Sequence, residues 1–203
     1  MESPGSAAMV EMVLDLLTRD LSALVIEGVV REDREAGVLA RHVWVAGPLH
    51  RIEEPPGRME WIEGERTTWR SWPSDQGVVA LPRPDLGEIH DHPTSLLARQ
   101  ERSWWAGLLG VGIGAGPRIE EVTFLGRAAL AATTARPGPP MQVIVDRRTG
   151  IELRHGRADQ DSAAAVWTRL TLHAQSDPAW FVWDGPWKRD ENWADYPAGW
   201  TPR

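Results

Sequence analysis

The chain has 203 residues, which suits one ordinary domain, because a folded protein of this mass buries about 70% of the surface that its unfolded chain exposes. Its 22 basic and 29 acidic residues give a net charge of −7, which argues against general nucleic-acid binding, since phosphate recognition needs a basic face. The absence of cysteine excludes disulfides, thiol catalysis and thiolate metal sites.

The first residues do not resemble an export signal, because residues 1–8 include Glu2 and contain no lysine or arginine. No stretch approaches the roughly 18 consecutive apolar residues of a membrane span. We therefore expect a soluble, cytoplasmic protein without a transmembrane segment.

Apolar residues at helical spacing from Val10 to Leu24 predict one amphipathic helix near the start of the chain. The hydrophobic period then falls to two, which predicts a strand over residues 23–31, a turn over residues 32–37 and a returning strand over residues 38–45. The same alternation, bounded by Gly, Pro or Ser-Asp, predicts further strands over residues 49–54, 59–62, 67–72 and 77–81.

A different segment opens at His92-Pro93, because proline suits the first position of a helix. Leu97, Trp104, Trp105 and Leu108 share one face and predict a central helix, which ends in the glycine-rich residues 110–116. That run follows a helix and precedes a strand, the reverse of a phosphate-binding loop, so we expect a flexible loop or hinge.

Strand periodicity resumes after the glycines and continues to Leu172. Asp146 and Gly150 enclose a turn that suits a hairpin between two of these strands. A helix beginning at Ala163 is the alternative for the last strand. The predicted strands cover residues 119–125, 128–136, 141–145, 151–154 and 166–172.

Several short phrases resemble members of the LolA/LolB/RseB-type lipoprotein-carrier superfamily. Residues 43–53 (VWVAGPLHRIE) and 91–97 (DHPTSLL) resemble its strand–turn–strand and the opening of its central helix. Residues 125–130 (LGRAAL) with 143–154 (VIVDRRTGIELR) resemble the hairpin of actinobacterial members, and residues 181–185 (FVWDG) resemble their closing motif.

This resemblance, together with the short regular strands, implies an α+β fold. We expect a curved antiparallel sheet that forms an unclosed β-barrel, with an N-terminal helix and a central helix covering the concave face. Residues 1–8 are then a flexible N-terminus, residues 9–183 a single open-barrel domain, and residues 184–203 an irregular Trp/Pro-rich tail. The chain has no lipobox cysteine, and the superfamily supplies no catalytic residues.

Tryptophan is the outstanding residue type, with 12 Trp against 2 Phe and 1 Tyr. Large aromatic side chains on the strands and the central helix predict a cavity for a lipid, an acyl chain or another hydrophobic small molecule. The alternative is that the same side chains fill the core, since one Trp buries about 150–250 Å². The cavity candidates are Trp44, Trp61, Trp69, Trp104, Trp105, Leu108, Phe124 and Trp167.

The C-terminal tail carries further tryptophans. They are candidates for binding a protein partner, with packing across the domain's own surface as the alternative. Acidic neighbours such as Asp184 and Asp190 argue against an anionic bilayer. The candidates are Trp183, Trp187, Trp193 and Trp200.

His90, Asp91 and His92 form the only tight cluster of metal-ligand types, and a polar loop is the simpler interpretation. No Ser-His-Asp arrangement or Gly-x-Ser-x-Gly motif is present. We therefore expect a non-enzymatic binding protein for a hydrophobic small molecule, without a cofactor. A protein-interaction module of the sigma-factor-sensor type is the alternative.

Overall fold

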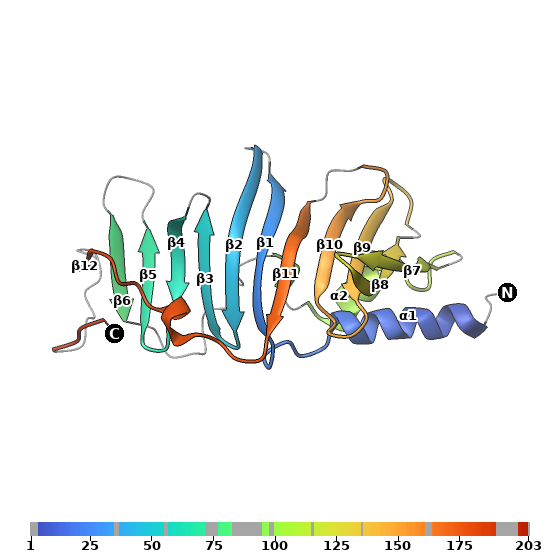
Figure 1. Cartoon of the computed structure of the whole chain (residues 1–203). Helices are drawn as coiled ribbons and strands as arrows, with labels where there is room; N and C mark the ends of the chain where they lie inside the picture. Colours follow the sequence, from blue (N-terminus) through green and yellow to red (C-terminus); the bar gives the residue numbers. More distant parts are fainter. Residues whose placement is uncertain are drawn as a thin grey trace. The chain divides into compact units, whose positions relative to one another are not determined.

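The computed structural model describes residues 4–34, 37–54, 57–71, 77–82, 95–97, 100–114, 116–134, 136–160, 164–189 and 199–202. The helices are α1 (Pro4–Leu17), η1 (Ser95–Leu97), α2 (Arg102–Leu109) and η2 (Pro178–Phe181) (Figure 1). The first six strands are β1 (Val25–Arg34), β2 (Gly37–Ala46), β3 (Leu49–Glu54), β4 (Arg58–Glu63), β5 (Thr67–Ser71) and β6 (Val78–Pro82). The last six are β7 (Arg118–Phe124), β8 (Arg127–Thr133), β9 (Met141–Asp146), β10 (Glu152–Arg157), β11 (Ala165–His173) and β12 (Trp187–Arg189).

The strands are hydrogen-bonded in the order β12-β6-β5-β4-β3-β2-β1-β11-β10-β9-β8-β7, so β12 and β7 are two separate edges and the sheet does not close. The pairs from β2 to β6 and from β7 to β11 are antiparallel. β12 is the exception, because it runs parallel to β6. The prediction of an α+β fold with an unclosed, mainly antiparallel sheet and two helices is confirmed.

The chain divides into two units, which we describe separately. Unit 1 comprises Met1–Leu21, Val30–Leu39 and Thr94–Arg169, and unit 2 comprises Ser22–Val29, Ala40–Pro93 and Leu170–Arg203. Unit 1 contains both α-helices and the strands β7 to β10. Unit 2 contains the strands β3 to β6, with η2 and β12 from the end of the chain.

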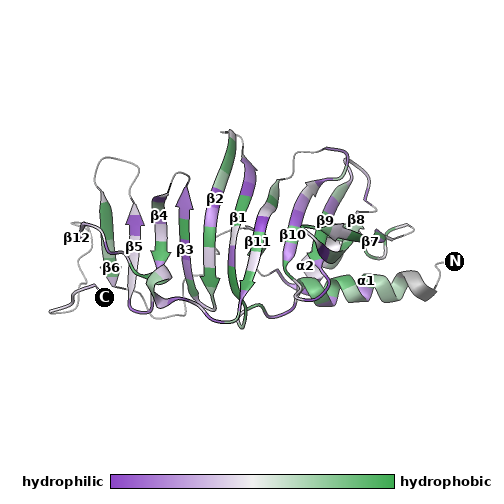
Figure 2. Cartoon of the chain, viewed as in Figure 1, coloured by the Kyte–Doolittle hydropathy of each residue, from purple (hydrophilic) through white to green (hydrophobic). Residues whose placement is uncertain are grey.

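Alternation along the strands fixes which side chains are buried. Val43 lies opposite Ile52 on neighbouring strands, and both side chains are buried. Trp44 and Arg51, one residue along, form the next pair and point to the other face of the sheet, as the two-residue period requires. Figure 2 shows hydrophobic residues along most of α1, interrupted by hydrophilic ones, as expected for a helix with one buried face.

The helices differ in extent from their predicted ranges. α1 begins at Pro4, before the predicted start at Val10, and ends at Leu17 instead of Leu24. The Thr18 hydroxyl donates a 2.8 Å hydrogen bond to the Leu14 carbonyl oxygen, and β1 starts at Val25. None of the described helices is long and apolar enough to span a bilayer.

The predicted central helix is also interrupted. It consists of a short η1 and a separate α2, with Gln100 and Glu101 non-helical between them. The tail has more regular structure than expected, because Trp187–Arg189 forms β12. The predicted metal-ligand cluster His90, Asp91 and His92 lies outside the described residues, as does Trp193.

Candidate functional site

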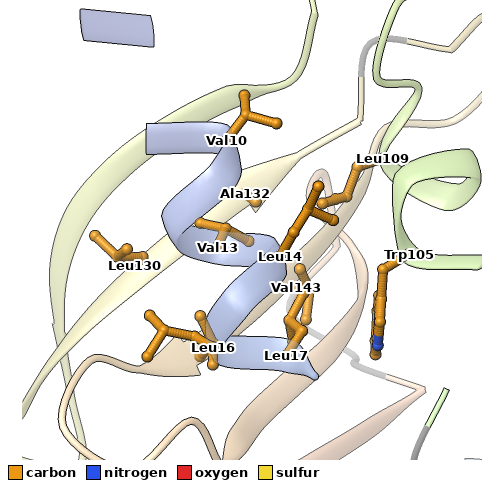
Figure 3. Close-up of a cluster of buried hydrophobic side chains, with 11 residues drawn as sticks. Val10, Val13, Leu14, Leu16, Leu17, Trp105, Leu109, Leu130, Ala132 and Val143 are labelled. Atoms are coloured by element: carbon orange, nitrogen blue, oxygen red, sulfur yellow. The ribbon is translucent and has the colours of Figure 1, made fainter. Parts of the chain in front are cut away.

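The helices of unit 1 cover one face of its strands and enclose an apolar cluster (Figure 3). Register places the strand members on one face, because Ala132 lies opposite Val143 and Leu130 opposite Val145. We call this set the helix-covered cluster. Its buried members are Val10, Val13, Leu14, Leu16, Leu17, Trp105, Leu109, Leu130, Ala132, Val143 and Val145.

Apolar side chains and exposed ion pairs hold α2 over this cluster. Trp105 and Leu109 are the buried residues of the helix. Its first residue, Arg102, forms ion pairs with Glu11 and Asp15 of α1, but all three side chains are more than 40% exposed. Exposed ion pairs stabilise a fold by about 0–1 kcal/mol, so the two buried side chains, with the partly buried Ala106 and Leu108, provide most of the attachment.

The C-terminal end of α2 turns sharply into the glycine-rich segment. Gly110 adopts the left-handed conformation, with φ 73° and ψ 36°, which glycine tolerates better than other residues. The Val111 amide donates to the Ala106 carbonyl oxygen at 2.9 Å and closes this turn. The helix is therefore bounded on this side by a tight glycine turn.

An aromatic pair joins the buried cluster to the surface. The rings of Trp104 and Trp105 meet edge to face, with centroids 4.7 Å apart. Trp105 is only 3% exposed, whereas Trp104 is 47% exposed. Val111 and Ile113, just beyond α2, are exposed as well. We call Trp104, Val111 and Ile113 the α2 apolar surface.

The two buried tryptophans of unit 1 differ in hydrogen bonding. The Trp167 indole Nε1 donates to the Glu152 carbonyl oxygen at 3.0 Å. The Trp105 Nε1 is buried and has no hydrogen-bond partner among the described residues. A buried donor without a partner costs about 1–3 kcal/mol, so this N–H is an unusual group in a folded protein.

A buried carboxylate lies on the same face of the strands. Glu152 is opposite Val145 of the helix-covered cluster, and its Oε1 lies 2.7 Å from the His155 Nδ1. Burial raises the pKa of the Glu152 carboxyl above its ordinary value, although the hydrogen bond and charge of His155 act in the opposite direction. Glu152 therefore holds a proton more tightly in the folded protein than in the unfolded chain.

Glu152→Gln should change how stability depends on pH. Because the folded-state pKa of Glu152 is raised, this residue contributes to the free energy of unfolding below the ordinary carboxyl pKa. The contribution is lost as the pH rises through the raised pKa. We expect the wild-type protein to lose free energy of unfolding relative to Glu152→Gln as the pH rises above about 4, the ordinary carboxyl value. Urea unfolding across this range measures the difference, and parallel pH profiles of the two proteins would contradict it.

Unit 2 has a second aromatic cluster on its own strands. We call it the unit 2 cluster, and its buried members are Met59, Ile62, Trp69, Ala80 and Phe181. The C-terminal segment contributes to it, since Phe181 belongs to η2. The partly buried residues packed against it are Trp44, Ala46, Leu49, Val78, Trp180, Trp183 and Trp200.

A row of polar side chains lies on three neighbouring strands of unit 2. The Nε2 atoms of His42 and His173 lie 3.1 Å and 3.0 Å from the two carboxylate oxygens of Glu27. The His42 ring also lies 3.7 Å from that of Trp44. Within the part of the chain that the structure describes, no group of three or more His, Asp or Glu side chains is arranged to hold a metal ion.

The predicted cavity residues divide between the units. Trp105 and Leu108 lie in or against the helix-covered cluster of unit 1. Trp69 and Trp44 lie in or against the unit 2 cluster. Trp61 is in unit 2 too, but the Arg70 guanidinium stacks on its ring at 3.7 Å. The remaining three belong to unit 1, where Trp104 is exposed, Trp167 fully buried and Phe124 half-buried.

The predicted partner-binding residues also differ in exposure. Trp183 and Trp200 pack against the unit 2 cluster, whereas Trp187 is 41% exposed on β12. Sequence analysis did not select Val111, Ile113, Glu152 or His155. The alternation of Val111 and Ile113 with glycines was a usable signal, because apolar residues between glycines have no regular element to bury them.

No family model and no curated protein matches the chain. Three solved structures illustrate what it is similar to. The complex of MucA and MucB from Pseudomonas aeruginosa matches with a TM-score of 0.45 and 12% identity, covering 85% of this chain and 59% of that chain. MucB alone matches with a TM-score of 0.46 and 14% identity, covering 86% and 62%.

A LolA superfamily protein from Nitrosomonas europaea matches with a TM-score of 0.30 and 10% identity, covering 88% of this chain and 97% of that chain. The chain spans about three fifths of the length of the MucB chains that it matches.

Proposed function

We propose that this chain is a non-enzymatic binding protein that takes a hydrophobic molecule, such as a lipid or an acyl chain, at the helix-covered cluster of unit 1. The Trp104–Trp105 pair carries the proposal, because it connects an exposed apolar surface directly with a buried one. Single exposed apolar residues are common, but three of them on a short helix and the turn that follows it are suited to ligand entry.

A ligand enters this site by displacing α2 from the sheet. The helix has eight residues, is attached by the buried Trp105 and Leu109, the partly buried Ala106 and Leu108 and exposed ion pairs, and ends at a left-handed glycine. Elements with few buried contacts open at lower free-energy cost than the core strands do. Apolar surface of the ligand then replaces the contacts of Trp105 and Leu109, and it gains about 25 cal/mol per Å² removed from water.

Trp104→Ala tests this proposal. We expect it to weaken binding of the neutral fluorescent probe N-phenyl-1-naphthylamine by about tenfold, or about 1.4 kcal/mol, because a half-exposed indole offers about 100 Å² of apolar surface. Probe fluorescence measures the affinity, and excitation beyond the tryptophan absorption avoids the protein's own signal. Native mass spectrometry of protein from its own host, followed by solvent extraction, identifies the natural ligand class.

Trp187→Ala is the matched control. Trp187 is exposed to a similar degree, at 41%, but belongs to unit 2. The control should bind the probe as the wild-type protein does. Equal affinities for the wild-type protein and both variants would remove the α2 apolar surface from the proposed site.

A protein-interaction function is the second candidate, and the exposure of Trp187 on the edge strand β12 favours it. Exposed tryptophans are frequent anchors of protein interfaces. Deleting the tail is a poor test, because Trp200 packs against the unit 2 cluster. A protein that copurifies with the wild-type chain and with Trp104→Ala, but not with Trp187→Ala, would support this candidate.

A further inference from the structure

The indole N–H group of Trp105 is buried, where a donor without a hydrogen-bond partner is costly. Trp105 is 3% exposed, and its Nε1 has no acceptor among the described residues. Trp105 shares the helix-covered cluster with Leu17 and Val143, and Figure 3 shows its indole nitrogen at the end of the ring away from the α2 ribbon. Native proteins pair nearly all buried donors, so an unpaired one points to a partner that binds from outside the chain.

The other buried tryptophan of unit 1 does not share this property. Trp167 is equally buried, yet its Nε1 donates to the Glu152 carbonyl oxygen. A phenylalanine at position 105 would fill much of the same space without an N–H group. The donor of Trp105 therefore contributes nothing to the packing of the ligand-free protein and adds a desolvation cost.

An ordered water is a poor partner for this group. A buried water typically forms about three hydrogen bonds, and the hydrophobic side chains of the helix-covered cluster, to which Trp105 belongs, offer none. A ligand that places a single oxygen against the indole satisfies the donor without further polar neighbours. Its hydrocarbon part remains among the leucine and valine side chains.

We propose that the molecule bound at the helix-covered cluster carries a hydrogen-bond acceptor, such as an ester or carboxyl carbonyl oxygen, which accepts the Nε1–H of Trp105. This inference rests on the proposed function and narrows its ligand class from any hydrophobic molecule to acyl compounds with a carbonyl oxygen next to the chain. Trp105 is the polar anchor, and the aliphatic side chains bind the hydrocarbon.

A comparison of two probes on three proteins tests the inference. Methyl dodecanoate carries a carbonyl oxygen and tetradecane does not, and each is titrated to displace N-phenyl-1-naphthylamine. The proteins are the wild type, Trp105→Phe, which keeps an aromatic ring but removes the donor, and Trp167→Phe, which removes a donor that already has a partner. The measured quantity is the tetradecane dissociation constant divided by the ester dissociation constant. Comparing this ratio between the proteins cancels the difference in hydrophobicity between the two probes.

We expect Trp105→Phe to lower this preference for the ester by about threefold to tenfold, the range of one neutral hydrogen bond, while Trp167→Phe leaves it unchanged. An unchanged ratio in Trp105→Phe would overturn the inference and leave the proposed function standing. If neither probe displaces the fluorophore from the wild-type protein, both fail.

Thermal unfolding of the ligand-free proteins provides a second measurement. We expect Trp167→Phe to lower the Tm, since it leaves the Glu152 carbonyl oxygen without its donor. Trp105→Phe should lower it less or raise it. Equal losses in the two variants would mean that the Trp105 donor has a partner within the folded chain, which would also overturn the inference.

Discussion

Gly150→Ala is expected to lower the free energy of unfolding by about 2–4 kcal/mol. Gly150 has φ +83°, a conformation that strains any residue with a Cβ. An added Cβ would lie 2.5 Å from the Leu16 carbonyl oxygen and 3.1 Å from the Arg19 Cβ. The first of these is a backbone atom at the end of α1, so the clash is relieved only by moving the helix away from the hairpin.

Gly126→Ala separates the two causes. Gly126 has a similar φ of +71°, but nothing lies within 4 Å of an added Cβ. The control should lose only about 1 kcal/mol, the cost of the backbone conformation alone. Urea unfolding of both variants measures the difference, and equal losses would show that α1 does not approach the hairpin as closely as this.

The contact between the hairpin at Gly150 and the end of α1 explains why the end of this helix is difficult to predict from the sequence. Leu21 and Leu24 continue the helical spacing of the preceding apolar residues, so local periodicity favours a helix to Leu24. In the folded chain the Arg19 guanidinium donates a 2.7 Å hydrogen bond to the Arg148 carbonyl oxygen, close to where the hairpin meets the helix. The two residues are 129 positions apart in the sequence, so no local pattern predicts this contact.

The hairpin itself was predictable because its signals are local. Asp146 accepts hydrogen bonds from the amides of Arg148 and Thr149, and Gly150 supplies the positive φ that closes the turn. Short strands bounded by glycine and proline follow the same logic. Strand positions therefore agreed well with the periodicity, whereas the limits of the helices did not.

It is harder to predict which tryptophans share one face of the sheet, because the two-residue period does not say which face is covered. Trp44 pairs with Arg51, and Trp61 pairs with Ile52, which neighbours Arg51 on the same strand. The two tryptophans therefore point to opposite faces, although both were expected to line one cavity. The unpaired donor of Trp105 was not foreseeable either, because hydrogen-bond satisfaction depends on contacts distant in sequence.

Phe181→Ala is expected to destabilise unit 2 by about 3–5 kcal/mol, the usual cost of removing a buried phenylalanine side chain. Phe181 is 3% exposed in η2 and packs in the unit 2 cluster with Ile62 and Trp69. Val182→Ala is the control, because this neighbouring side chain is 40% exposed and should cost less than about 0.5 kcal/mol. Denaturant unfolding measures both values, and similar losses would contradict the packing of η2 on the strands.

Hydrogen exchange on Phe181→Ala then tests whether residues 9–183 form the single domain that the sequence predicts. The strands β1, β2 and β11 each contain residues of both units. If the chain unfolds as one cooperative domain, the amides of β8 and β9 in unit 1 lose protection by the same free energy as those of β4 and β5 in unit 2. Loss confined to β4 and β5 would mean that the units unfold separately. In that case a ligand bound at the helix-covered cluster would stabilise unit 1 alone, because binding stabilises only the structure that unfolds with its site.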